Sequence, residues 1–205
     1  MLAKNHLNSS RFRSDDVKHD NCFAGEGYNK VRPINAITDY ETSSGMSKAT
    51  IVAARDTLLA QKSLTIAVFD DSAVPDLGIS PFIRRHDGLY IYTSHLAGHV
   101  QALLAQNRAS FIIALDEAAT SNIWARHRLK FGGAVAEVPR DDAEFPALCD
   151  DFAAAHGNTM RLIRDFTDFH MLRITPDNGV LVLGFAKAFC VKGASFDIVA
   201  HLARG

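Results

Sequence analysis

The stretch LTIAVFDDSAVPDLGISPFIRRHDGLYIYT, residues 64–93, decides the fold. It holds three short apolar runs, at 64–69, 79–84 and 89–93, whose β-branched and aromatic residues are typical of strands. A turn through Asp70-Asp71-Ser72 follows the first run, and His86-Asp87-Gly88 joins the second to the third with the Asp-Gly pair of a tight hairpin. Because tight hairpins cannot join parallel strands, the stretch predicts a mainly antiparallel sheet.

Helical and strand patterns alternate on both sides of this stretch. Apolar residues with helical spacing predict an amphipathic helix over 47–61 with Ser47 as its N-cap, and further helices over 96–105, 121–125, 141–156 and 196–202. We expect further strands over 109–115, 126–138, 169–174, 180–185 and 188–191, with Asp177-Asn178-Gly179 as a break between two of them. The chain is therefore predicted to be α+β, with an antiparallel sheet closed into a small barrel.

Composition and charge narrow the class of protein. The 205 residues include 22 Lys+Arg and 23 Asp+Glu, so the net charge of -1 argues against a dedicated nucleic-acid binder. No apolar stretch approaches the ~20 residues that a membrane-spanning helix needs. Residues 1–45 are polar and without period, so we expect a flexible N-terminal arm followed by one domain over 46–205. The first residues show no apolar leader, which favours a cytoplasmic protein.

A polar cluster lies where a predicted strand gives way to a predicted helix. Thr93 and Ser94 end the strand, and His95 and His99 follow around the start of the helix. A helix N-terminus offers free backbone N–H groups, so hydroxyls and an imidazole beside it form a plausible phosphate seat. The alternative is that Ser94 only caps the helix. His95 and His99 are also spaced for a metal, although no third ligand is evident.

A second basic cluster, Arg126 to Lys130, lies in a predicted strand. Strict alternation puts Arg126, Arg128 and Lys130 on one face and His127 on the other. Guanidinium groups on a barrel face favour an anionic ligand such as a nucleotide phosphate or a propionate, because uncompensated charges there are costly. The alternative is a solvated edge strand whose arginines pair with Asp or Glu.

Two further residues are open to either a structural or a functional interpretation. His201 lies near the end of the predicted last helix, where a charged imidazole would suit the helix dipole. Asp168 precedes a predicted strand and either orients an imidazole from elsewhere or forms a turn. The motifs GxSxG, GxxxxGK[ST] and GxGxxG are absent, which argues against the corresponding hydrolases, kinases and dinucleotide-binding dehydrogenases.

Three segments together resemble a known superfamily. They are YTSHLAGHVQALLAQNRASFIIAL at 92–115, WARHRLKFGGAVAEV at 124–138 and DFHMLRITPDNGVLVLGFAKAFCVKGASFDIVAHLARG at 168–205. Their order and motifs resemble the pyridoxamine-phosphate-oxidase-like FMN-binding split barrels, and within them the haem-utilisation branch of HugZ/HutZ type. The resemblance covers about residues 47–205 and implies a mainly antiparallel split β-barrel with flanking helices.

The resemblance also implies a homodimer with small-molecule sites at the subunit interface. In flavin-binding members the phosphate lies at the strand-to-helix turn and on basic strand residues, which match Thr93, Ser94, His99, Arg126 and Arg128. In haem-degrading members a C-terminal histidine binds the iron and an aspartate of the partner subunit, here matched by Asp168, contacts that histidine. His201 matches the first histidine of the tail, and the branch usually carries a further histidine beyond the position of Gly205, where the given sequence ends.

We therefore expect haem or FMN as cofactor, with no nucleic-acid or membrane partner. The first hypothesis is a haem-utilisation protein that binds and oxidatively degrades haem for iron acquisition, with Asp168 as its catalytic residue. The alternatives are an FMN-dependent oxidoreductase and a non-catalytic dimer that binds haem or flavin.

Overall fold

Nine strands, four α-helices and two 3₁₀ helices (Glu117–Ala119 and Ile123–Ala125) make up the part of the chain that the structure describes, residues 30–33 and 44–203 of a computed structural model. The strands are β1 (Lys30–Pro33), β2 (Ser63–Phe69), β3 (Pro75–Arg85), β4 (Gly88–Ser94), β5 (Arg108–Ala114), β6 (Arg128–Val138), β7 (Phe169–Val182), β8 (Ala188–Lys192) and β9 (Asp197–Ala203). The helices are α2 (Lys48–Leu59), α3 (Gly98–Gln106), α4 (Phe145–His156) and α5 (Thr159–Ile163).

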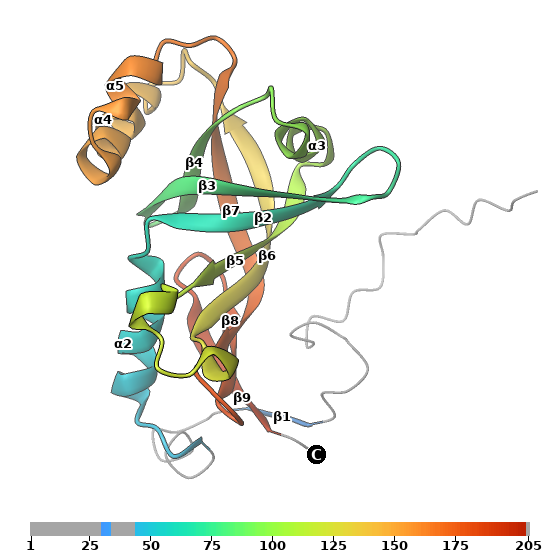
Figure 1. The fold of residues 1–205 in the computed structure, drawn as a ribbon, viewed down its shortest axis with the longest axis vertical. Helices are drawn as coiled ribbons and strands as arrows, with labels where there is room; N and C mark the ends of the chain where they lie inside the picture. Colours follow the sequence, from blue (N-terminus) through green and yellow to red (C-terminus); the bar gives the residue numbers. More distant parts are fainter. Residues whose placement is uncertain (1–29, 34–43, 204–205) are drawn as a thin grey trace, which may run out of the picture.

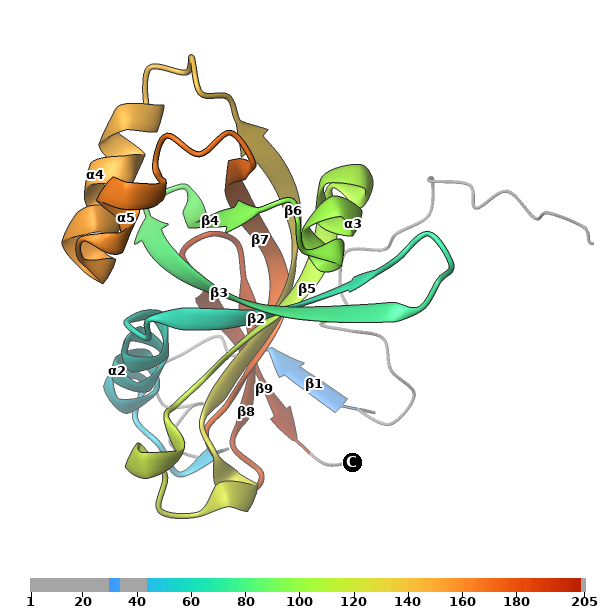
Figure 2. The same cartoon turned by 45° about the horizontal axis from the view of Figure 1, so that its top comes forward.

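Six strands close into an antiparallel barrel (Figure 1). Their order is β7-β4-β3-β2-β5-β6, and β6 returns to pair with β7. The stretch at 64–93 forms β2, β3 and β4 as consecutive antiparallel neighbours, with a tight turn at His86 and Asp87. The helices lie outside the strands, with α4 and α5 packed together on one side and α3 on another (Figure 2). The predicted α+β fold, a mainly antiparallel split barrel with flanking helices, is confirmed.

The long strand β7 corrects one prediction. A break at Asp177-Asn178-Gly179 was expected, yet β7 runs through it, because β6 pairs with β7 on both sides of that point. The tripeptide marks a change of neighbour on the other edge of β7: residues 169–174 pair with β4 and residues 178–182 pair with β8. A Cβ on Gly179 would lie 2.6 Å from the Lys130 carbonyl, so this glycine permits close strand pairing rather than a turn.

The C-terminal segment corrects a second prediction. Residues 196–202 were expected to form a helix, but β9 occupies 197–203 and pairs with β8 on one side and β1 on the other. A short apolar run does not distinguish a buried strand from a helix, and here the partner strands decide. Strand β1 comes from the expected N-terminal arm. The rest of that arm, residues 1–29 and 34–43, lies outside the described residues.

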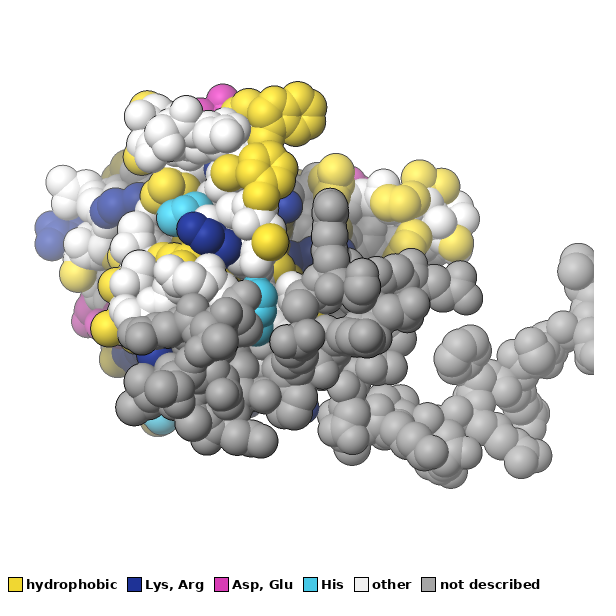
Figure 3. Space-filling model, turned by 90° about the horizontal axis from the view of Figure 1, so that it is seen from below, with side chains coloured by type: hydrophobic (Ala, Val, Ile, Leu, Met, Phe, Trp, Pro, Cys, Tyr) yellow, Lys and Arg dark blue, Asp and Glu magenta, His cyan; other side chains and the backbone are white. Residues whose placement is uncertain are grey.

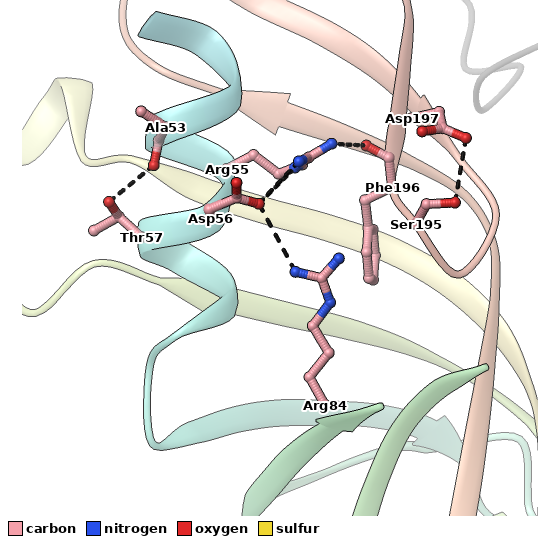
Figure 4. A network of polar contacts seen from close by, with 8 residues as sticks. All are labelled: Ala53, Arg55, Asp56, Thr57, Arg84, Ser195, Phe196 and Asp197. Carbon is pink, nitrogen blue, oxygen red and sulfur yellow. Dashed lines mark hydrogen bonds and ion pairs between the residues drawn. The ribbon is translucent and has the colours of Figure 1, made fainter. Parts of the chain in front are cut away.

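Polar contacts fix α2 against the barrel, as the close view shows (Figure 4). Ser47 caps the helix as predicted, with its hydroxyl accepting from the Thr50 N–H at 3.2 Å. The Arg55 guanidinium donates to the Phe196 carbonyl at 3.3 Å and pairs with Asp56 at 2.9 Å. Arg84 of β3 approaches the same carboxylate at 3.8 Å. Helix α2 is thereby tied both to β3 and to the turn before β9.

Candidate functional site

The end of β4 and the start of β7 bring two of the predicted site residues into contact. The Ser94 hydroxyl donates to a carboxylate oxygen of Asp168 at 2.5 Å, and the His95 N–H donates to the Asp168 carbonyl at 2.9 Å. The adjoining Thr93 pairs with His170 in the β4–β7 register. Helix α3 begins only at Gly98 with Ala97 as its N-cap, so the alternative in which Ser94 caps this helix is wrong.

Two histidines and a carboxylate form a chain of side-chain contacts beside this pair. Nδ1 of His170 lies 2.6 Å from Oε1 of Glu137 on β6, and Nε2 of His170 lies 3.0 Å from Nδ1 of His95. Sequence reasoning missed Glu137, since no motif distinguishes it from other carboxylates on strands. The Asp168 carboxylate accepts from the Ser94 hydroxyl. The prediction that Asp168 orients an imidazole from elsewhere stays a prediction.

The loop that carries Asp168 is held by Arg140. Its guanidinium donates to the carbonyls of Arg164 and Phe169, at 2.8 and 3.0 Å, and to the Tyr92 hydroxyl at 3.2 Å. Burial raises the pKa of Tyr92, and its hydroxyl donates to the Arg164 carbonyl at 2.9 Å. The loop is therefore anchored at several points before β7 begins.

His99 points at β3. A Cβ added to Gly78 would lie 2.1 Å from Nε2 of His99, so the imidazole rests directly on the backbone of this glycine. His95 instead contacts His170, and the two imidazoles of the predicted metal pair have different partners. No group of three or more metal-ligating side chains occurs in residues 30–33 and 44–203.

The contact between Gly78 and His99 yields a testable prediction. In Gly78→Ala the new methyl group displaces the imidazole, which moves by side-chain rotation, so we expect a change in free energy of unfolding within about 1 kcal/mol. The His99 ring resonances in NMR spectra should shift strongly. Gly132→Ala is the control, because a Cβ there meets nothing closer than 3.9 Å. Unchanged His99 resonances would contradict the described contact.

Arg126 does not share the strand face predicted for it. It precedes β6, and its guanidinium donates to the Leu115 carbonyl at 2.6 Å and pairs with Glu117 at 2.9 Å. Arg128, the first residue of β6, donates to the Arg126 carbonyl at 3.0 Å. Among the described residues no carboxylate pairs with Arg128, so its charge is available to an external anion.

The two halves of the predicted anion seat lie at opposite ends of β7. Ser94 pairs with Phe169 at its first residue, and Arg128 pairs with Val182 at its last. These positions are 13 residues apart, which is about 43 Å along a strand at ~3.3 Å per residue. One chain therefore does not bring Ser94 and Arg128 into the same site.

Exposed apolar side chains surround the Arg128 end of the barrel. Ile123 and Trp124 in the turn before β6 are 56% and 82% exposed, and Phe185 after β7 is 70% exposed. The two turns are neighbours, since a Cβ on Gly184 would lie 4.0 Å from that of Ala125. From below, large hydrophobic side chains project from the surface, with basic and histidine side chains nearby (Figure 3). Exposed apolar groups beside a cation that pairs with no carboxylate of the described residues are typical of a binding surface.

His201 lies in β9, so the prediction that it ends a helix is wrong. The side chain is 2% exposed and packs against Phe189 with ring centroids 5.1 Å apart. Nε2–H donates to the Ala186 carbonyl at 2.9 Å, and Nδ1 is buried without a hydrogen-bond partner among the residues that the structure describes. The imidazole is thus part of the packing between β8 and β9.

Two observations concern other parts of the described chain. A cleft of about 560 Å³ lies between the ends of α2 and α4 and contains none of the predicted site residues.

Each helix within residues 44–203 falls short of the length and apolar character that crossing a membrane requires.

No family model matches the chain. The haem oxygenase HutZ of Vibrio cholerae serotype O1 (strain ATCC 39315 / El Tor Inaba N16961) is 27% identical over 145 residues, which cover 71% of this chain and 82% of that protein. The crystal structure of HutZ, described as a haem storage protein from Vibrio cholerae, is 25% identical with a TM-score of 0.61 and covers 65% of this chain and 94% of its own.

Campylobacter jejuni ChuZ shares the fold at 21% identity, with a TM-score of 0.70 over 78% of this chain and 65% of its own. A haem-binding protein from Mycobacterium smegmatis does so at 18% identity, with a TM-score of 0.64 over 74% of this chain and 61% of its own. The resemblance found in the sequence is confirmed: the chain has the split-barrel fold and is similar to the haem-utilisation protein HutZ.

Proposed function

We propose that the protein binds haem in a homodimer and that its reaction is the oxidative opening of this haem for iron acquisition. The observation that carries the proposal is the similarity to the haem oxygenase HutZ over 71% of the chain. The residues present fit the group. Haem requires an imidazole for iron, cations for its propionates and apolar surfaces for its ring, and each of these is found at one of the two ends of β7.

The separation of these ends supports the proposed dimer. Ser94, Asp168 and the histidines lie at one end of β7, and Arg128 with the exposed Trp124 and Phe185 lies at the other. A second copy in the opposite orientation places the Arg128 end of one protomer beside the Asp168 end of its partner. Exposed Leu77 and Ile79 on β3, 64% and 74% accessible, supply apolar surface for such contacts.

The bound haem supplies the iron and the redox chemistry with dioxygen. The role of the chain's own residues is to bind the haem and to orient it. Arg128, whose guanidinium no described carboxylate neutralises, would hold a propionate, and the exposed Trp124 and Phe185 would contact the apolar ring. Asp168 keeps the β4–β7 junction in place through Ser94.

Parallel titrations with ferric haem and FMN test the proposal. We expect a Soret band that saturates at one haem per protomer and no binding of FMN at equal concentrations. Saturable flavin binding without a Soret band would instead support the FMN-dependent oxidoreductase, for which the same basic groups would hold the phosphate.

Removal of the free guanidinium should weaken haem binding. We expect Arg128→Ala to raise the Kd for ferric haem about tenfold, the loss of one charge-assisted hydrogen bond of about 1.4 kcal/mol. Titration of the Soret absorbance measures this change. Arg84→Ala is the matched control, since Arg84 is exposed on β3 and pairs with Asp56. Equal affinities for wild type and Arg128→Ala would exclude this role.

A further inference from the structure

His201 is a buried imidazole whose polarity the packing around it does not need. It lies on β9 opposite Phe189 of β8, is 2% exposed and packs against the Phe189 ring. Nδ1 is buried without a hydrogen-bond partner among the described residues, and burying such a nitrogen costs free energy. A leucine would fill this space without that cost. What distinguishes a histidine here is the bond from Nε2–H to the Ala186 carbonyl at 2.9 Å.

This carbonyl belongs to a tight turn under backbone strain. Residues 183–187 connect β7 to β8, and the Leu183 N–H donates across the turn to the Lys187 carbonyl at 2.8 Å. Ala186 has a φ of +57°, in the left-handed region that residues with a Cβ rarely adopt. Such a conformation persists only where its surroundings hold it. The bond from His201 to the carbonyl of the strained residue is a restraint of this kind.

The turn at 183–187 carries part of the surface proposed for the ligand. Phe185, at its centre, is 70% exposed, and a Cβ on Gly184 would lie 4.0 Å from that of Ala125. Ala125 ends the short helix that carries the exposed Trp124, and β6 begins at Arg128 just beyond it. The position of Phe185 relative to Trp124 and Arg128 therefore depends on the conformation of this turn.

We propose that His201 is a positioning residue that holds the turn at 183–187 in the conformation that presents Phe185 beside Trp124 and Arg128. The imidazole acts on the ligand through the Ala186 carbonyl and not by contact with it. The inference rests on the proposed function for the identity of the ligand as haem. Because a turn that is already formed needs no ordering when the ligand binds, affinity depends on a side chain that the ligand does not touch.

The haem-free protein provides the first test. Hydrogen exchange measured by NMR reports the opening of the turn at the Leu183 and Lys187 amides, which both donate within it. We expect His201→Leu to speed their exchange at least tenfold relative to amides in the middle of β4, which report global unfolding. In His201→Gln the relative rates should stay close to wild type, because the glutamine amide supplies an N–H in place of Nε2–H. Equal relative rates in wild type and His201→Leu would overturn the inference.

Ferric haem separates a positioning role from iron ligation. We expect His201→Leu to raise the Kd at least threefold and His201→Gln to bind within twofold of wild type, with the same absorption spectrum of bound haem in all three. If His201 were the iron ligand, both variants would lose the wild-type spectrum, and the inference would be overturned. His156→Leu is the matched control, since Nε2 of His156 bonds the Phe82 carbonyl at the same 2.9 Å but lines the cleft between α2 and α4.

Ala186→Gly acts on the turn alone. Glycine adopts a positive φ without strain, so the turn then needs less support from the imidazole. We expect this change by itself to leave the Kd for haem within twofold of wild type, because the turn is already formed. Combined with His201→Leu, it should bring the Kd back to within twofold of wild type. No recovery in the double variant would mean that His201 does not act by holding Ala186.

The outcomes separate this inference from the proposed function. Wild-type protein without a Soret band contradicts the proposed function, and the exchange rates of the haem-free protein still decide whether His201 holds the turn. Haem binding that is equally tight in wild type and His201→Leu overturns the role of His201 and leaves the proposed function in place.

Discussion

A heterodimer of an Asp168→Ala chain and an Arg128→Ala chain should bind one haem with wild-type affinity, although each variant alone binds haem at least tenfold more weakly. The reason is that the two ends of β7 lie 13 residues apart, which is about 43 Å of chain along the strand. If each site takes its Asp168 end from one protomer and its Arg128 end from the partner, one of the two sites in this heterodimer is intact. Differently tagged chains, co-expressed and purified over both tags, allow the stoichiometry and Kd to be measured by Soret titration.

The same pair of substitutions provides the control. When both are placed on one chain and combined with a wild-type partner, each of the two sites shared between the protomers loses one of its residues, and no intact site is left. A site within one protomer would give the opposite result, with one intact site in the second heterodimer and none in the first. The two arrangements contain the same substitutions in the same number, so differences in expression or stability do not account for the outcome.

Local sequence patterns were sufficient to predict most strands of the barrel. The apolar runs at 64–69 and 89–93 and the Asp-Gly turn act over neighbouring residues, and the structure confirms β2, β3 and β4. The predictions for 177–179 and 196–202 were wrong because strands distant in the sequence determine the structure of both segments. β6 carries β7 through the Asp-Asn-Gly tripeptide, and β1 with β8 holds residues 197–203 as a strand.

Local sequence patterns also failed to predict which site residues come into contact. Ser94 and Asp168 were both predicted from their positions at strand ends, but they are 74 residues apart and only the register between β4 and β7 joins them. Arg128 and Ser94 were assigned to one anion seat, and the length of β7 separates them. Glu137 is one carboxylate among 23 acidic residues, and its contact with His170 depends on the pairing of β6 with β7.

Gly88→Ala should lower the free energy of unfolding by about 3 kcal/mol, which for a domain of this size corresponds to a fall in Tm of about 6–12 °C. The sequence places Gly88 in a hairpin turn, but the structure adds a stronger constraint. Its φ is +155°, and an added Cβ would lie 2.3 Å from the Ile174 carbonyl of β7. This oxygen belongs to the backbone of the closed barrel, so it has no side-chain rotation by which to move away.

Gly193→Ala separates the steric contact from the backbone strain. Gly193 also has a positive φ, +68°, yet a Cβ there meets nothing within 4 Å, so only the strain of about 1 kcal/mol is expected. Urea unfolding of both variants, monitored by circular dichroism, compares the two losses. A Gly88→Ala variant no less stable than Gly193→Ala would mean that β4 and β7 separate at little cost, and the junction that holds Ser94 against Asp168 would then be too loose to define a binding geometry.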